Sequence, residues 1–161
     1  MKIARGLALL TLLGTMGAAI AQLKPSSPSN PPLPPSSTEA RKTEAQAVKE
    51  MAARLAAEKW LAIVDSGELG KAWDQSARRF RENVTRQQWV ESVPKTRGAL
   101  GAMKSRRVEV ASYKSSLPGM PEGDYVTVRF YTNFAKKDDA QEMVTLVFED
   151  GTWRPLGYGV G

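Results

Sequence analysis

The sequence of 161 residues contains no cysteine and no histidine. Without these two residue types the chain can form no disulfide, no thiol nucleophile, no Ser/His/Asp triad and none of the usual zinc sites. Its acidic residues are scattered and follow no calcium-loop pattern. We therefore expect no cofactor and no metal, and these absences favour a binding or interaction protein over an enzyme.

A strong excess of one charge is also lacking. The formal net charge is +6, with 23 basic and 17 acidic residues. Lys2 and Arg5 lie in a segment that we expect to be removed, and without them 21 basic side chains face 17 acidic ones. Proteins that bind nucleic acids usually carry a denser basic stripe, so we expect no nucleic-acid partner.

Residues 1–21 have the three regions of a secretory signal peptide. Lys2 and Arg5 are followed by an uncharged apolar run and then by Ala19-Ile20-Ala21. We predict cleavage after Ala21, which would leave the protein in the periplasm or secreted, with no membrane span. The alternative is an uncleaved anchor, although the apolar run falls short of the roughly 20 residues that a membrane-spanning helix needs.

Residues 22–37 are rich in proline and serine and contain almost nothing that a core could bury. Proline fixes φ and removes an amide donor, so this stretch is predicted to be an extended, disordered linker. It could instead be a ligand for an aromatic groove on another protein.

Three helices are expected in the next sixty residues. Residues 38–65 lack proline and glycine and carry apolar residues at spacings of three and four, so they form one long helix, of which 38–52 would be an extension. Residues 68–82 are a second helix, and a third runs to Gly98. Two capping boxes, Ser36 with Glu39 and Thr85 with Gln88, mark helix starts. Pro94 is expected to kink or break the third helix.

The C-terminal sixty residues change to a period of two, which is typical of strands. The clearest run is 125–134, where Val126, Val128 and Phe130 share one face. The other predicted strands are 106–114, 142–149 and 153–160, of which the last is irregular because of Pro155 and two glycines. The sequence thus predicts an α+β fold over residues 53–161, with three N-terminal helices packed on a four-stranded antiparallel meander in a cone-like arrangement.

Several segments of this region resemble a bacterial family known as domain of unknown function 4019. They are WLAIVDSGELGKAWDQSARRF, QWVESVPKTRGALG, SRRVEVASYKSSLPGMPEGDYVTVRFYTNFA, EMVT and GTWRPLGYG, and together they cover most of residues 53–158. The resemblance implies an exported envelope protein without an assigned activity. The order of elements also resembles the nuclear transport factor 2-like or cystatin-like cone, in which helices close over a curved sheet and leave a pocket.

The best candidates for ligand contacts are Arg97, Arg129 and Tyr131. Arginine can hold a carboxylate or phosphate through two hydrogen bonds, and a neighbouring tyrosine adds another. The alternative is that these arginines form salt bridges, for example with Glu142 or Glu109.

Arg78, Arg79 and Arg81 crowd the expected end of the second helix. Cations there would complement the negative end of the helix dipole. The alternative is an anion-binding patch.

Tryptophans at helical spacing from other apolar residues are expected to be core residues rather than an aromatic binding box. They are Trp60, Trp73, Trp89 and Trp153. For catalysis the chain leaves only a carboxylate paired with a tyrosine in an apolar pocket, and the candidates are Asp65 or Asp74 with Tyr131 or Tyr158.

We therefore expect an exported binding or interaction domain whose partner is a small ligand or an envelope protein. The alternatives are a small hydrolase or isomerase and a self-associating structural domain.

Overall fold

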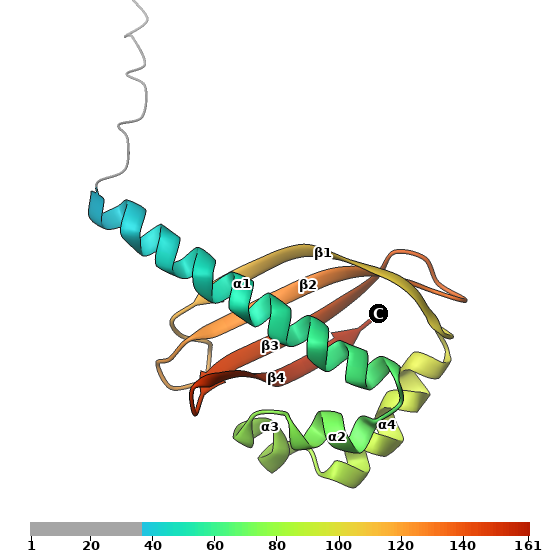
Figure 1. Cartoon of the computed structure of the whole chain (residues 1–161). Coiled ribbons are helices and arrows are strands. Elements are labelled where there is room, and N and C mark those ends of the chain that lie inside the picture. The colour runs from blue at the N-terminus through green and yellow to red at the C-terminus, as the bar shows by residue number, and fades with distance from the viewer. Residues whose placement is uncertain (1–36) are drawn as a thin grey trace, which may run out of the picture. The chain divides into compact units, whose positions relative to one another are not determined.

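The computed structural model describes residues 37–161 (Figure 1). The predicted signal peptide, the Pro/Ser-rich linker up to residue 36 and Ser36 of the first capping box lie outside the described residues. Four helices come first, followed by four strands. They are α1 (Ser37–Asp65), α2 (Leu69–Asp74), α3 (Arg78–Asn83), α4 (Arg86–Gly98), β1 (Met103–Lys114), β2 (Tyr125–Phe134), β3 (Ala140–Glu149) and β4 (Thr152–Val160).

The four strands form one antiparallel sheet in the order β1-β2-β3-β4, which confirms the predicted α+β fold and meander. The helix α1 crosses one face of this sheet, and the three short helices gather beside β4 (Figure 1). Asp150 and Gly151 both have positive φ and join β3 to β4, as expected for a two-residue hairpin turn.

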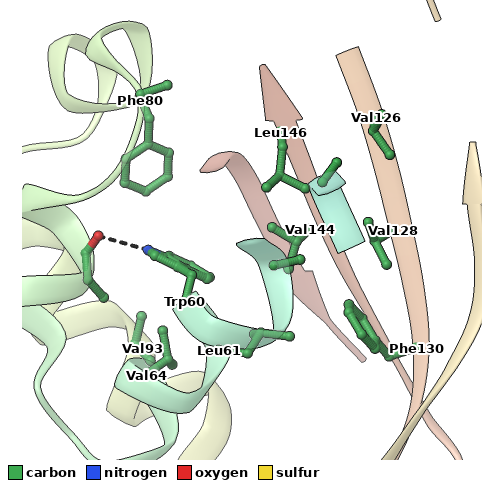
Figure 2. Close-up of a cluster of buried hydrophobic side chains, with 14 of the residues drawn as sticks. Trp60, Leu61, Val64, Phe80, Val93, Val126, Val128, Phe130, Val144 and Leu146 are labelled. Carbon is green, nitrogen blue, oxygen red and sulfur yellow. Dashed lines mark hydrogen bonds between the residues drawn. The ribbon is translucent and has the colours of Figure 1, made fainter. Parts of the chain in front are cut away.

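The core lies between α1 and the sheet (Figure 2). Val126, Val128 and Phe130 of β2 are at most 1% exposed and face α1, as their alternation predicted. Opposite them, Ala53 and Ala57 are small enough to let the helix approach the sheet closely. Burial of a side chain of the Val or Phe type stabilises the fold by about 1.5–3 kcal/mol.

Indole rings join α2 to α1 and to α4. Trp60 Nε1 donates to the carbonyl of Ala72 at 2.8 Å (Figure 2), and Trp89 Nε1 donates to the carbonyl of Leu69 at 3.0 Å. Both rings are buried, which confirms that these two tryptophans are core residues, whereas Trp73 and Trp153 are half-buried.

The predicted helix 68–82 is wrong in one respect, because it is broken into α2 and α3. The backbone turns to an extended conformation at Ala77, whose N–H donates to the carbonyl of Pro155 in β4 at 2.7 Å. The buried Ser76 hydroxyl donates to the carbonyl of Ala72. The arginines at 78 and 79 consequently begin α3 instead of ending a longer helix, so the proposed role at its C-terminal dipole does not apply to them.

Two other local predictions need correction. Regular alternation over 106–114 predicts Val108, Val110 and Ser112 on one face. The pairing of β1 with β2 shifts between Val108 and Val110, and this bulge moves Ala111 and Tyr113 to the core side of the sheet in place of Ser112. Of the kink or break expected at Pro94, the break does not occur, because α4 continues through this residue. The carbonyl that proline leaves without a donor belongs to Val90, a solvent-exposed residue, so water can satisfy it.

The irregular last strand is confirmed. The strand β4 lies at the edge of the sheet. Its pairing with β3 is irregular at Leu156, an extra residue between Pro155 and Gly157, which pair with Leu146 and Thr145. Proline is tolerated at such a margin because an edge strand needs fewer ladder donors.

Candidate functional site

Four charged side chains from distant parts of the chain meet on the helix-covered side of the sheet. Asp65 ends α1, Arg97 lies near the end of α4, Arg106 belongs to β1 and Glu142 belongs to β3. We call this group, together with Thr132 and Tyr158, the buried ion network. Its positions follow from the strand alternation, because Arg106, Thr132 and Glu142 stand in phase with the core residues of their strands.

Glu142 is the most buried member, with an exposed fraction of 0%. Its carboxylate accepts hydrogen bonds from Arg106 Nε at 2.6 Å, from the Thr132 hydroxyl at 2.9 Å and from the Tyr158 hydroxyl at 2.6 Å. Burial, and then the charge of Glu142, raise the pKa of Tyr158 far above its usual range, so its hydroxyl remains a donor.

Asp65 is the second carboxylate of the network. Arg106 donates to both of its oxygens, at 2.8 and 3.1 Å, and Arg97 Nη2 donates to Oδ1. Burial alone would raise the pKa of Asp65, but the hydrogen bonds from Arg106 and Arg97 outweigh it and hold the pKa below its usual range.

The network is balanced in charge, and both of its carboxylates are fully engaged by hydrogen bonds. Two carboxylates face two guanidinium groups, and no fully buried side-chain nitrogen or oxygen within residues 37–161 lacks a partner. Arg97 also lies over the Phe134 ring, 5.3 Å from its centroid. A carboxylate saturated in this way is poorly placed to remove a proton from a substrate, so the geometry favours a role in holding elements and orienting Arg97.

A cleft of about 290 Å³ opens beside the network, where the ends of α1 and α4 meet the segment that leads into β1. Its lining is largely apolar, with Asp65 and Arg97 as the charged members. The apolar side chains are those of Val64, Leu69, Val93, Pro94, Ala102 and Met103. Within residues 37–161 the guanidinium of Arg97 makes one hydrogen bond, through Nη2, so Nε and Nη1 are left without a protein acceptor. Neither atom is fully buried, because every fully buried polar side-chain atom of the described region has a partner.

The structure separates the predicted ligand residues. Arg97 lies on the helix side of the sheet, whereas Arg129 and Tyr131 lie on the opposite face. Arg129 forms a salt bridge with Glu109 at 3.2 Å, and the Tyr131 hydroxyl donates to the same carboxylate at 3.3 Å. Arg129 and Tyr131 therefore do not share a cleft with Arg97.

The three arginines of α3 also point to different partners. Arg78 approaches Asp150 at 3.7 Å, Arg79 donates to the carbonyl of Gly119 at 3.2 Å, and Arg81 lies 5.8 Å from the Trp73 ring centroid. They share no acceptor and do not converge on one anion site.

Of the carboxylate and tyrosine pairs considered from sequence, Asp65 and Tyr158 belong to one network but are joined by hydrogen bonds through Arg106 and Glu142. Asp74 instead lies 3.5 Å from Arg86. The residues that sequence reasoning missed are Arg106 and Thr132, together with the central place of Glu142. The available signal was a polar side chain at a core-facing position of a strand, since Glu142 is in phase with Val144.

A titration experiment checks the role of Asp65. Because the pKa of Asp65 is lower in the folded state, its stabilising contribution is complete above its unfolded pKa of about 3.9 and is lost as the pH falls through the folded value. We expect Asp65→Asn to be less stable than the wild type by about 2 kcal/mol at pH 7. This difference should shrink steadily below about pH 4 in urea unfolding followed by circular dichroism. A difference that stayed constant down to pH 2 would contradict the assignment.

Within residues 37–161, no group of three or more acidic side chains is placed to hold a metal ion, and no helix is both long and apolar enough to cross a membrane. Among known families, residues 56–158 match one described as "Protein of unknown function (DUF4019)". No curated protein matches the chain.

Proposed function

The chain belongs to the DUF4019 family, and from this premise we propose that it is an exported binding domain without catalytic activity. We propose further that its ligand is a small molecule with an apolar body and one anionic group, held in the cleft beside Arg97. Export is supported by the basic, apolar and small-residue regions of residues 1–21.

The type of ligand is inferred from the residues that line the cleft. Its walls are apolar, and its charged end offers Arg97 nitrogens that no described residue uses. Ligand sites typically combine apolar walls with a small number of well-placed polar groups. A guanidinium held in place by Asp65 and Phe134 is oriented before a ligand arrives, so little ordering entropy is lost on binding.

The alternative of a small hydrolase or isomerase has less support. Both carboxylates near the cleft are already bonded to arginines, and the Tyr158 hydroxyl is engaged by Glu142. A general base needs a free lone pair directed at the substrate proton.

The cleft can be tested by filling it from Gly98. Gly98 lines the cleft and is solvent-exposed, and a Cβ added there would meet nothing within 4 Å. Neither Gly98→Phe nor the matched control Gly98→Ala therefore starts from a clash with the packed interior. We expect octanoate to bind the wild type with a dissociation constant on the order of 1 mM. Gly98→Phe should weaken binding by roughly tenfold or more, whereas Gly98→Ala should change it by less than about twofold.

The measurement is titration by ¹H–¹⁵N NMR, with the Arg97 side-chain Nε–H as a local reporter. Octanol serves as the neutral comparison, because it keeps the chain length but loses the charge that Arg97 would recognise. Equal binding of octanoate and octanol would contradict the proposal that the ligand carries an anionic group recognised by Arg97. Undiminished octanoate binding by Gly98→Phe would reject the cleft itself.

A further inference from the structure

The long helix α1 carries a second apolar stripe that faces away from the sheet. Val48, Met51 and Leu55 are large hydrophobic residues of α1, and they are 65%, 52% and 46% exposed. At about 100° per residue they fall on one side of the helix, opposite the buried Ala53 and Ala57. The core therefore cannot account for them.

The apolar stripe is followed at each end by a charged residue on the same side of the helix, acidic at the N-terminal end and basic at the C-terminal end. Glu44 lies four residues before Val48, and Lys59 lies four residues after Leu55. Both side chains are solvent-exposed, and neither forms a salt bridge with any residue of 37–161. The small Ala52 and Ala62 complete the stripe and would let another helix approach closely.

The buried side of α1 holds the helix in a fixed orientation. Lys49 pairs with Asp124 at 2.6 Å, the Tyr113 hydroxyl donates to Asp124 at 2.7 Å, and the Tyr113 N–H donates to Glu50 at 2.9 Å. Since these contacts link α1 to β1 and to the start of β2, the apolar stripe cannot turn inward without breaking them.

We propose that the outward stripe of α1 is the interface for a second copy of this chain, with the two α1 helices antiparallel about a two-fold axis between Met51 and Ala52. In this register Val48 of each copy meets Leu55 of its partner. Each Glu44 meets the other copy's Lys59, so two ion pairs form at the ends and no like charges face each other. A two-fold interface requires such self-complementarity.

The charge pattern distinguishes this partner from a membrane. A helix that binds anionic lipid usually surrounds its apolar face with lysine and arginine, whereas this stripe is bounded by Glu44 and Glu58 as well as by Arg41 and Lys59. This balance of acidic and basic residues matches the α1 helix of a second copy that runs antiparallel to the first.

Sedimentation velocity over a range of concentrations tests the interface. We expect a concentration-dependent dimer in the wild type and a monomer for Leu55→Glu. Glu44→Lys and Lys59→Glu should each weaken the dimer by roughly tenfold, because each single change turns two attractions into two repulsions. The double variant Glu44→Lys/Lys59→Glu should recover wild-type affinity. A wild type that stays monomeric at high concentration, or a double variant no tighter than the single ones, would overturn the proposal.

The absence of cysteine allows the register to be tested independently. In a mixture of the single variants Val48→Cys and Leu55→Cys, oxidation should link one variant to the other. Two copies of Val48→Cys should not link, because these positions would lie roughly 10 Å apart along the paired helices, beyond the limit of about 7 Å between Cα atoms for a disulfide. Mass spectrometry distinguishes the products, and preferential linkage of Val48→Cys to itself would indicate a parallel pair and reject the model of the interface.

Discussion

Replacing Glu142 by alanine is expected to lower the free energy of unfolding by about 3–5 kcal/mol. The carboxylate is fully buried and compensates the charge of Arg106, so its removal leaves an arginine in the interior with Asp65 as its one anionic partner among residues 37–161, and Arg106 shares that partner with Arg97. The hydroxyls of Thr132 and Tyr158 lose their acceptor as well. Urea unfolding followed by circular dichroism measures the change.

Two further variants separate the loss of charge balance from a general effect of substitution. Glu109→Ala removes a carboxylate from the exposed salt bridge with Arg129 and should cost less than about 1 kcal/mol. The double variant Glu142→Leu/Arg106→Leu leaves Asp65 and Arg97 as a balanced pair and should recover much of the lost stability. If the double variant were less stable than Glu142→Ala, packing rather than uncompensated charge would explain the effect.

The second large effect is expected at Trp89, where alanine should cost about 3–5 kcal/mol. This indole packs within 6 Å, centroid to centroid, of Trp60, Phe80 and Tyr158, and its Nε1 donates to the carbonyl of Leu69. Its removal would leave a cavity among these rings and a carbonyl without its donor. Because Trp89 joins α4 to α2, hydrogen exchange should rise in α2 and α4 more than in β2 and β3.

Trp89→Phe and Trp153→Ala are the comparison variants. The first keeps an aromatic ring but not the hydrogen bond, so its cost should fall between those of the wild type and the alanine variant. The second removes a half-buried indole that packs on Phe148 at 5.4 Å and should cost clearly less than Trp89→Ala. An equal cost for Trp89→Ala and Trp153→Ala would show that the central ring cluster has no special role.

The fold could be predicted because each half of the chain repeats one period. In the strand 125–134 four of the five alternate positions on one face are apolar, and this alternation alone places Val128 and Phe130 toward the helices. The same reasoning could have found Glu142, whose position in β3 is in phase with Val144. Its burial is hard to predict because a carboxylate on a core face is unfavourable unless cations are brought to it, and Arg106 comes from a strand 36 residues away in sequence.

Other features depend on distant contacts and leave no local pattern. The break between α2 and α3 is stabilised by the carbonyl of Pro155, which lies 78 residues after Ala77. The bulge in β1 reverses the alternation beyond Val108, although the sequence there is compatible with a regular strand. The position of Arg97 beside Asp65 likewise requires the packing of α4 against α2, whereas the face occupied by Arg129 follows from strand alternation alone.

The continuous helix α1 also determines how this protein can be attached to a support. Its residues 37 and 65 lie roughly 40 Å apart along the helix axis, and the cleft lies at the Asp65 end. A tag or surface linkage placed ahead of residue 37 would therefore hold the cleft at a distance and leave its mouth accessible. Immobilisation at that end is suited to ligand screening by surface plasmon resonance, whereas linkage through lysines near α4 would risk obstruction.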